Sequence, residues 1–370
     1  MNGPDLLLPA PVQAAPLPEV RNHTPHPSQY YQMMDVGDEV FHVIASRITY
    51  DLTRLDEQGA PPLAAVQAPL VEADEFYGDP TSSSCIQESD FAPYKPKCDI
   101  ILAHAVAYAP EGKPHQRWPV GIRIGEWQKM LAVTGARYVD RGLLGWKVTE
   151  PQKATQVPLR WELAYGGSCQ WPRHLKEDEE PEIFKAFEAN PLGTGWTDKA
   201  WLKKAQVADV DAPQIEVFDQ PFGTEEANAM AYPAVGVGPV GKWWTPRRQK
   251  AGTYDQAWKE SRWPRLPLDF DFGYWNAAPE DQQIEYPQGG EELVLAGLTP
   301  GQQVWRCKLP EPAIHAVLRM QIGPIVRLPM RLDTLVLDFK AGTLSCMYRI
   351  QVGAQFGARV LELRSGRAPI

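Results

Sequence analysis

Short apolar runs separated by turn residues form the main hydrophobic pattern of this chain. In VFHVIASRITYDL, residues 40–52, both alternating faces are apolar, which predicts a strand covered on both sides. CDIILAHAVAYAP, residues 98–110, has the same pattern and predicts a second strand, in which His104 is a hydrogen-bonded core histidine. In residues 118–135, two alternating runs flank the pair Gly-Glu at 125–126, so we expect a hairpin that turns there.

Later stretches add further elements to this pattern. PLRWELAYGG, residues 158–167, predicts a strand by its alternation of large apolar and polar side chains. EIFKAFEAN, residues 182–190, predicts a short amphipathic helix that follows an acidic solvated loop at 176–182. LDTLVLDFKAGTLSCMYRIQV, residues 332–352, predicts two strands joined by a three-residue loop in which Gly342 is free to adopt a positive φ.

Turn residues indicate the fold class. The 36 prolines and 29 glycines leave few windows long enough for a regular helix. We therefore expect a mainly β fold, with sandwich-like antiparallel sheets, long ordered loops and a few short helices. The pattern divides the chain into a proline-rich arm at 1–30 that lies along the surface or is mobile, a first β-rich lobe at 31–170, a loop-rich middle region with short helices at 171–290, and strands at 291–370 that complete the core.

Composition and charge exclude several classes of partner. The net charge of −9 opposes binding to nucleic acid, which favours basic surfaces. No apolar run reaches the roughly 18 to 20 residues that a membrane span needs. The apolar N-terminal stretch is interrupted by prolines and follows no basic residue, so it does not fit a secretory signal. We therefore expect a cytoplasmic protein with no nucleic-acid or membrane partner.

Cysteine and histidine usage argues against disulfides, metals and cofactors. The five cysteines include no Cys-x-x-Cys pair, which predicts free buried thiols. The seven histidines are scattered, so local spacing predicts no metal site. GVGPVG at 236–241 has the letters of a dinucleotide-binding loop, but the prolines around it disfavour the strand and helix that such a loop requires. We expect no metal and no cofactor.

Residues 243–283 form an aromatic-rich stretch, WWTPRRQKAGTYDQAWKESRWPRLPLDFDFGYWNAAPEDQQ. Within it, Thr253 and Gln256 fit a capping box at the start of a short helix. The helix would place Tyr254 and Trp258 at i and i+4, stacked against each other. Two aromatic rings would then face the same partner.

Asp269 and Asp271 in the same stretch permit two interpretations. On one face of an extended segment, they would bind a hard cation or act as acid and base. Alternatively, they accept hydrogen bonds from loop backbone and from Arg262 or Arg265, which ties irregular segments together. The second interpretation is favoured, because ordered loops must satisfy their polar groups. No G-x-S-x-G elbow occurs either, and we predict no catalytic residue.

Several long motifs occur in order along the chain: EADEFYGDPTSSSCIQESDFAPYKPKCDIIL, PLRWELAYGG, NPLGTGW, PVGKWWTPRRQKAGTYDQAWKESRWPRLPLDFD and NAAPEDQQ. Over roughly residues 35 to 350 they resemble the bacterial domain-of-unknown-function family encoded beside PAAR and VgrG spike genes in type VI secretion clusters. The resemblance implies a non-catalytic adaptor or chaperone. Such a protein binds a toxic effector, often one carrying a PAAR tip, and helps load it onto the VgrG spike. The resemblance brings no active-site residues.

This resemblance, together with a density of Trp, Tyr and Arg that is typical of interface hot spots, selects the candidate partner-binding residues. They are Trp243, Trp244, Arg247, Arg248, Tyr254, Asp255, Trp258, Arg262, Trp263, Asp269, Asp271, Asp281, Gln282, Tyr77, Tyr94 and Lys95.

The alternative is a carbohydrate-binding or glycoside-hydrolysing protein. The 13 tryptophans would provide platforms for sugar rings. A glycosidase needs only two carboxylates, which Asp269, Asp271 or Glu162 would supply. We favour the adaptor, because the sequence has no recognisable catalytic constellation.

Overall fold

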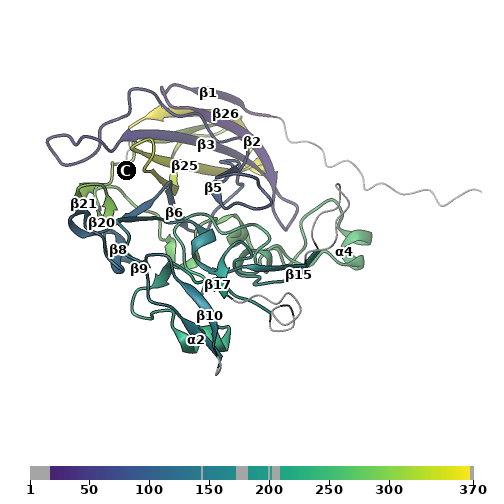
Figure 1. The fold of residues 1–370 in the computed structure, drawn as a ribbon. Coiled ribbons are helices and arrows are strands. Elements are labelled where there is room, and N and C mark those ends of the chain that lie inside the picture. The colour runs from purple at the N-terminus through teal and green to yellow at the C-terminus, as the bar shows by residue number, and fades with distance from the viewer. Residues whose placement is uncertain (1–16, 143–144, 172–181, 199–200, 202–208, 367–370) are drawn as a thin grey trace, which may run out of the picture.

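The computed structural model describes residues 17–142, 145–171, 182–198, 201 and 209–366. Three larger β-sheets and several short ribbons make up most of this part of the chain, and the helices between them are short (Figure 1). The predicted mainly β fold with antiparallel sheets is confirmed. No helix in the described ranges has the length and apolar character that a membrane crossing requires.

The largest sheet has six strands and takes them from both ends of the chain. Its pairs are antiparallel except for β6 and β24, which run parallel. In spatial order the strands are β19 (Gln283–Ile284), β6 (Cys98–Ala103), β24 (Arg331–Asp338), β25 (Thr343–Gly353), β3 (Val40–Asp51) and β2 (Ser28–Met34). The strands predicted at 40–52 and 332–352 are confirmed and form the centre of this sheet.

Two other sheets flank it. The four-stranded sheet has the order β1 (Glu19–Asn22), β26 (Ala358–Ser365), β22 (Ile314–Met320) and β23 (Ile325–Pro329). The five-stranded sheet has the order β18 (Ile215–Val217), β9 (Trp127–Thr134), β8 (Arg117–Ile124), β20 (Glu292–Thr299) and β21 (Gln302–Lys308). The predicted hairpin is confirmed, since Ile124 pairs with Trp127 across a turn in which Gly125 has a φ of 56°.

The remaining elements are short. The three-stranded sheet has the order β11 (Gly145–Val148), β10 (Tyr138–Gly142) and β17 (Asp209–Asp211). The two-stranded ribbons are β12 (Gln156–Pro158) with β7 (Val106–Tyr108), β13 (Tyr165–Gly166) with β16 (Thr194–Gly195), β14 (Ser168–Trp171) with β15 (Glu182–Ala186), and β4 (Glu75–Phe76) with β5 (Cys85–Gln87). The helices are α2 (Thr224–Ala229), α3 (Thr245–Arg248) and α4 (Gln256–Ser261), and the 3₁₀ turns are η1 (Pro110–Gly112), η2 (Trp161–Leu163), η3 (Phe272–Trp275), η4 (Glu280–Gln282) and η5 (Ala354–Phe356).

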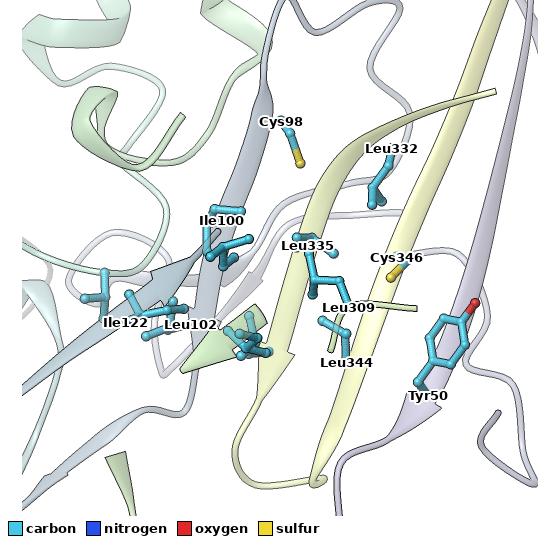
Figure 2. Close-up of a cluster of buried hydrophobic side chains, with 14 of the residues drawn as sticks. Tyr50, Cys98, Ile100, Leu102, Ile122, Leu309, Leu332, Leu335, Leu344 and Cys346 are labelled. Carbon is cyan, nitrogen blue, oxygen red and sulfur yellow. The ribbon is translucent and has the colours of Figure 1, made fainter. Parts of the chain in front are cut away.

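The three larger sheets share one hydrophobic core (Figure 2). In β3, Ile44, Ile48 and Tyr50 point into this core, in step with the two-residue period of a strand. Cys98 and Cys346 lie in the same cluster. All five cysteines of the chain are buried and unpaired, as predicted.

The opposite face of β3 is also covered, by loops held through buried polar contacts. Arg47 of β3 donates to the carboxylate of Asp90 at 3.0 Å, and the same carboxylate accepts the N–H of Val71 at 2.8 Å. In β25, Arg349 donates to Asp333 at 2.6 Å, and both side chains are buried. Cover on both sides explains why neither face of VFHVIASRITYDL is a solvated polar face.

The strand predicted at 98–110 is interrupted at His104. β6 ends before this residue, and β7, which follows it, belongs to a different ribbon. His104 has a φ of 55°, which turns the chain out of the sheet, and its N–H donates to the hydroxyl of Tyr77 at 2.8 Å. The His104 ring lies 3.1 Å from Asp338, so the predicted hydrogen bonding is confirmed. The predicted core position is wrong, because His104 is half-buried and lies outside the strand.

The strand predicted at 158–167 is wrong over most of its length. Residues 161–163 form the 3₁₀ turn η2, and within 158–167 only Pro158, at the end of β12, and residues 165–166 belong to strands. The carbonyl of Trp161 accepts a hydrogen bond from the Asn190 side chain at 2.9 Å, and its indole donates to the carbonyl of Gly238 at 3.3 Å. These long-range contacts fix the turn, and local alternation does not reveal them.

The helix predicted at 182–190 is also wrong. Residues 182–186 form β15, which pairs antiparallel with β14. Phe187 then packs edge to face on the buried ring of Tyr165, with ring centroids 5.2 Å apart. Strand pairing and this packing outweigh the helical spacing of the apolar residues. Most of the predicted acidic loop at 176–182 lies outside the described residues.

Residues 17–30 of the predicted arm contain β1 and the start of β2, so this part of the arm lies along the surface. β1 runs parallel to β26, with exposed side chains. Residues 1–16 lie outside the described part of the chain. The main core takes residues from the predicted first lobe at 31–170, from the middle region, including Ile215 and Val237, and from the C-terminal strands.

Candidate functional site

The aromatic-rich stretch folds into a short helix and the loops around it, residues 253–271, which we call the α4 lobe. It lies at the right-hand margin of the view in Figure 1. Asp255 is the N-cap of α4, and its carboxylate accepts a hydrogen bond from the N–H of Trp258 at 2.8 Å. Tyr254 and Trp258 stack edge to face with ring centroids 4.7 Å apart, which confirms their predicted contact.

Two arginines fix the α4 lobe to the turn between β2 and β3. Arg262 donates to both carboxylate oxygens of Asp38 at 3.1 Å and to the carbonyl of Val36 at 3.0 Å. Arg265 donates to the same carboxylate at 2.8 Å, and its own carbonyl accepts the indole N–H of Trp258 at 2.9 Å. Charge-assisted bonds of this kind hold the lobe against a segment that is distant in sequence.

The α4 lobe presents large apolar side chains to solvent. The exposed fraction is 52% for Tyr254, 66% for Trp263 and 71% for Leu268, whereas Trp258 is half-buried. Outside the lobe, just before α3, Trp243 is 73% exposed. These side chains are therefore available to contact another molecule.

The two aspartates of the lobe accept hydrogen bonds from loop groups. The carboxylate of Asp269 accepts hydrogen bonds from the hydroxyl of Thr253 at 2.7 Å and from the backbone N–H of Thr253 at 3.0 Å. These two bonds lower the pKa of the Asp269 carboxyl. Asp271 accepts the N–H of Gly273 at 2.7 Å at the start of η3. Acceptance from loop backbone was predicted and is confirmed. The predicted arginine partners are wrong, because Asp38 binds both guanidinium groups, and Thr253 is not the cap of α4.

The third carboxylate of the carbohydrate hypothesis is also held by neighbouring groups. Glu162 in η2 accepts the N–H of Ser84 at 2.8 Å on one oxygen and its hydroxyl at 2.7 Å on the other. Among the described residues, no three His, Cys, Asp or Glu side chains gather as a metal site would require.

An apolar groove of about 400 Å³ opens on the face of the six-stranded sheet that lies away from the core. Its lining includes Met33 of β2, Phe41 of β3, Tyr94 and Phe272, and we call it the β2 groove. The rings of Tyr94 and Phe272 meet edge to face, with centroids 6.0 Å apart. Of these four residues, Tyr94 alone was predicted as a partner-binding residue, since nothing in the local sequence pattern places the other three side chains together.

Arg247 in α3 is an internal anchor. It is 3% exposed and forms a salt bridge with Glu88. Its guanidinium also donates to the carbonyl of Tyr274 at 2.7 and 3.0 Å and to that of Val240 at 2.8 Å. Arg247 therefore joins three loops and leaves little surface for a partner.

The neighbours of Arg247 differ in exposure. Trp244 is half-buried and meets Trp161 edge to face, with ring centroids 5.3 Å apart. Arg248 is exposed and donates to Glu188 at 2.8 Å. Of these two candidates, only Arg248 is on the open surface.

Asp281 and Gln282 connect η4 to the sheets. The buried amide of Gln282 donates to the carbonyls of Ile100 at 2.6 Å and Val237 at 2.9 Å. Asp281 accepts the amine of Lys129 at 2.8 Å. Burial lowers the pKa of the Lys129 amine, and the carboxylate of Asp281 opposes that shift. The contacts described for both candidate residues stabilise the fold.

Lys95 and Tyr77 also bind within the protein. The buried Lys95 amine donates to Asp99 and to the hydroxyl of Thr334, each at 2.8 Å. The Tyr77 hydroxyl accepts the N–H of His104, as described above. The predicted motif residues therefore divide into buried or half-buried anchors and an exposed group that lies mainly on and near the α4 lobe.

Comparison with known proteins adds a family assignment. Neither the curated proteins nor the solved structures gave a match. A protein-family model described as an uncharacterized protein conserved in bacteria matches residues 37–349. Because this match covers most of the chain, the protein belongs to that bacterial family, DUF2169.

Proposed function

We propose that the protein is a non-catalytic adaptor or chaperone, acting in the cytoplasm, that binds a type VI secretion effector associated with PAAR and helps load it onto the VgrG spike. The motif resemblance suggests this class of function. The α4 lobe and the β2 groove would form the surface that contacts the effector.

The observation that carries the proposal is the exposure of aromatic side chains on an anchored support. Tyr254 and Trp263 project from a lobe that Arg262 and Arg265 hold to Asp38. Exposed Trp and Tyr side chains on ordered support are typical of interface hot spots, because little conformational entropy is lost when a partner binds. Single exposed apolar residues are common, but a group of them marks a binding surface.

The carbohydrate alternative has less support. Trp243 and Trp263 offer exposed rings for stacking on sugars. Asp269 and Glu162, however, have both carboxylate oxygens bonded to hydroxyl or backbone groups of neighbouring loops. A glycosidase needs one carboxyl group free to donate a proton and another to act as base or nucleophile.

Co-expression with the effector encoded beside this gene tests the proposal. We expect a stable complex on size-exclusion chromatography and a higher yield of soluble effector. Trp263→Ala should weaken the complex by roughly tenfold or more, as loss of a hot-spot residue does. The matched control is Ile322→Ser, which removes a side chain that is 94% exposed between β22 and β23. Absence of a complex with the unmodified protein would rule the proposal out.

A further inference from the structure

In the described part of the chain, one side of the β2 backbone pairs with no strand, and of its outward groups the carbonyl of Tyr30 accepts a hydrogen bond from the Gln29 side chain at 3.3 Å. β2 is the last strand of the six-stranded sheet, with β3 as its one strand neighbour among the described residues. The N–H of Asp35 donates to Glu39, and the N–H of Arg47 donates to Pro27, each at 3.0 Å. Hydrogen-bonded pairs alternate along an antiparallel ladder, so the odd-numbered residues of β2 bond to β3. The even-numbered residues, including Gln32, direct their N–H and C=O groups away from the sheet.

The β2 groove lies on the same strand. Met33 faces it from β2, and its partner in the ladder, Phe41, faces it from β3. Side chains on adjacent strands that share a face lie about 4.5 to 5.5 Å apart. A further strand paired to β2 would therefore place alternate side chains beside Met33, at the edge of the β2 groove. The rings of Tyr94 and Phe272 form aromatic walls of this groove.

Acidic residues border this hollow. Asp35 lines the groove, Glu39 adjoins it in the β2–β3 turn, and Asp271 precedes the groove residue Phe272. None of these three carboxylates forms a salt bridge with a described residue, whereas the nearby Asp38 is paired with two arginines. With Asp38 and its two arginines included, four carboxylates and two guanidinium groups lie around the groove, so the rim keeps a net negative charge, which favours a cationic partner.

We propose that the open side of β2 and the β2 groove bind an extended segment of another protein by strand addition. Alternate side chains of that segment are apolar and enter the groove, and the residues at the ends of this apolar run are Lys or Arg and reach the acidic rim. Backbone hydrogen bonds supply the pairing, and the groove and rim supply the selectivity. The identity of the biological segment rests on the proposed function, since an effector or spike protein would carry it.

A synthetic peptide tests the binding without any effector. The probe is an acetylated and amidated peptide of alternating Lys and Val, titrated into the full chain and followed by amide NMR and hydrogen exchange. We expect slower exchange at the outward amides of Tyr30, Gln32 and Met34. A peptide of alternating Glu and Val should bind about tenfold more weakly or worse, since its charge repels the rim. Two further peptides carry backbone N-methyl groups, one on its valines and the other on its lysines. Binding should be abolished in the peptide whose methylated N–H groups would pair with β2.

A pair of protein variants locates the site. Gln32→Pro removes an outward N–H, while the bonds of β2 to β3 come from the odd-numbered residues and are kept. Gln32→Ala keeps that N–H and serves as the matched control. We expect the proline variant to bind the Lys–Val peptide roughly tenfold more weakly than the alanine variant, as loss of an interstrand bond and distortion of the edge would cause.

Equal binding by the two variants, or protection confined to other strands, would overturn the inference. Equal binding of the Glu and Lys peptides would contradict the inference that the acidic rim selects cationic segments. If the proline variant does not fold, the N-methylated peptides decide the same question on the unmodified protein. Because no effector is needed, these results stand even where co-expression rejects the adaptor function.

Discussion

At the residue scale, buried charged side chains determine how loops cover the outer face of the six-stranded sheet. Arg349 donates to Asp333 at 2.6 Å and to the hydroxyl of Tyr31 at 2.5 Å. It also donates to the carbonyls of Asp90 at 2.8 Å and Ala92 at 2.7 Å. Without this guanidinium, the buried carboxylate of Asp333 would lose its cationic partner and the carbonyl of Asp90 its donor, which is more costly than the loss of an apolar contact.

Arg349→Met should lower the free energy of unfolding by about 3 to 5 kcal/mol, because Asp333 stays buried without its partner. Urea denaturation followed by tryptophan fluorescence measures the change. The control is Arg306→Met, which removes an exposed pair with Glu292 and should cost less than about 1 kcal/mol. Similar costs for the two variants would contradict a structural role for the buried pair.

Glu362 should make stability sensitive to acid. Hydrogen bonds from Arg319 and then Arg364 lower the pKa of this carboxyl from 4.5 to about 2. Because the folded pKa lies below the unfolded value, the stabilisation is present above the unfolded pKa and is lost as pH falls toward the folded one. Urea midpoints from about pH 6 to about pH 2.5 should fall more steeply in the unmodified protein than in Glu362→Gln. Parallel profiles would show that Glu362 does not carry this dependence.

At the element scale, the sequence predicts strands well where both faces pack on continuous structure. β3 and the β24–β25 hairpin follow from apolar periodicity, because neighbouring strands satisfy their backbone throughout. The predictions fail where distant groups decide the conformation, as with Asn190 holding η2 and β14 pairing with β15. The candidate site shows the same limit. Its aromatic residues are visible in the sequence, but the pairing of Arg262 with Asp38 joins segments that no local pattern connects.

The cap of α4 provides a test of this limit. Asp255→Ala removes the bond to the Trp258 N–H and should destabilise the helix by about 1 kcal/mol, which speeds exchange of its amides roughly fivefold. Thr253→Val removes only the hydroxyl bond to Asp269 and should leave those amide rates unchanged. Hydrogen exchange measured by NMR compares the two variants. Faster exchange in α4 for the Thr253 variant would restore the capping box that the sequence predicts.

At the scale of the whole molecule, surface segments are attached to one shared core in different ways. The three larger sheets pack around this core. Among the buried anchors, Lys95 attaches a loop to β6 and β24, and Arg247 joins loops to one another. The α4 lobe has a more local attachment, in which Arg262 and Arg265 converge on Asp38. Because Asp38 belongs to the β2–β3 turn, the same contact fixes the lobe next to the strand that bears the open edge. A partner that binds both would be sensitive to this one carboxylate.

Asp38→Asn tests that attachment directly. Asparagine tolerates the positive φ of 67° at this position, so the turn is kept while the negative charge is removed. Weakening of two charge-assisted contacts should lower the free energy of local opening by about 1 to 2 kcal/mol, and speed trypsin cleavage after Arg262 and Arg265 roughly five- to thirtyfold. Mass spectrometry of limited digests gives the rates at each site, and the thermal midpoint of the whole protein should change little because the core is untouched. Glu188→Gln, which loosens the exposed pair with Arg248, is the control and should leave both cleavage rates unchanged. Unchanged cleavage in the Asp38 variant would mean that packing of Trp258 and its neighbours, and not the arginine contacts, holds the lobe in place.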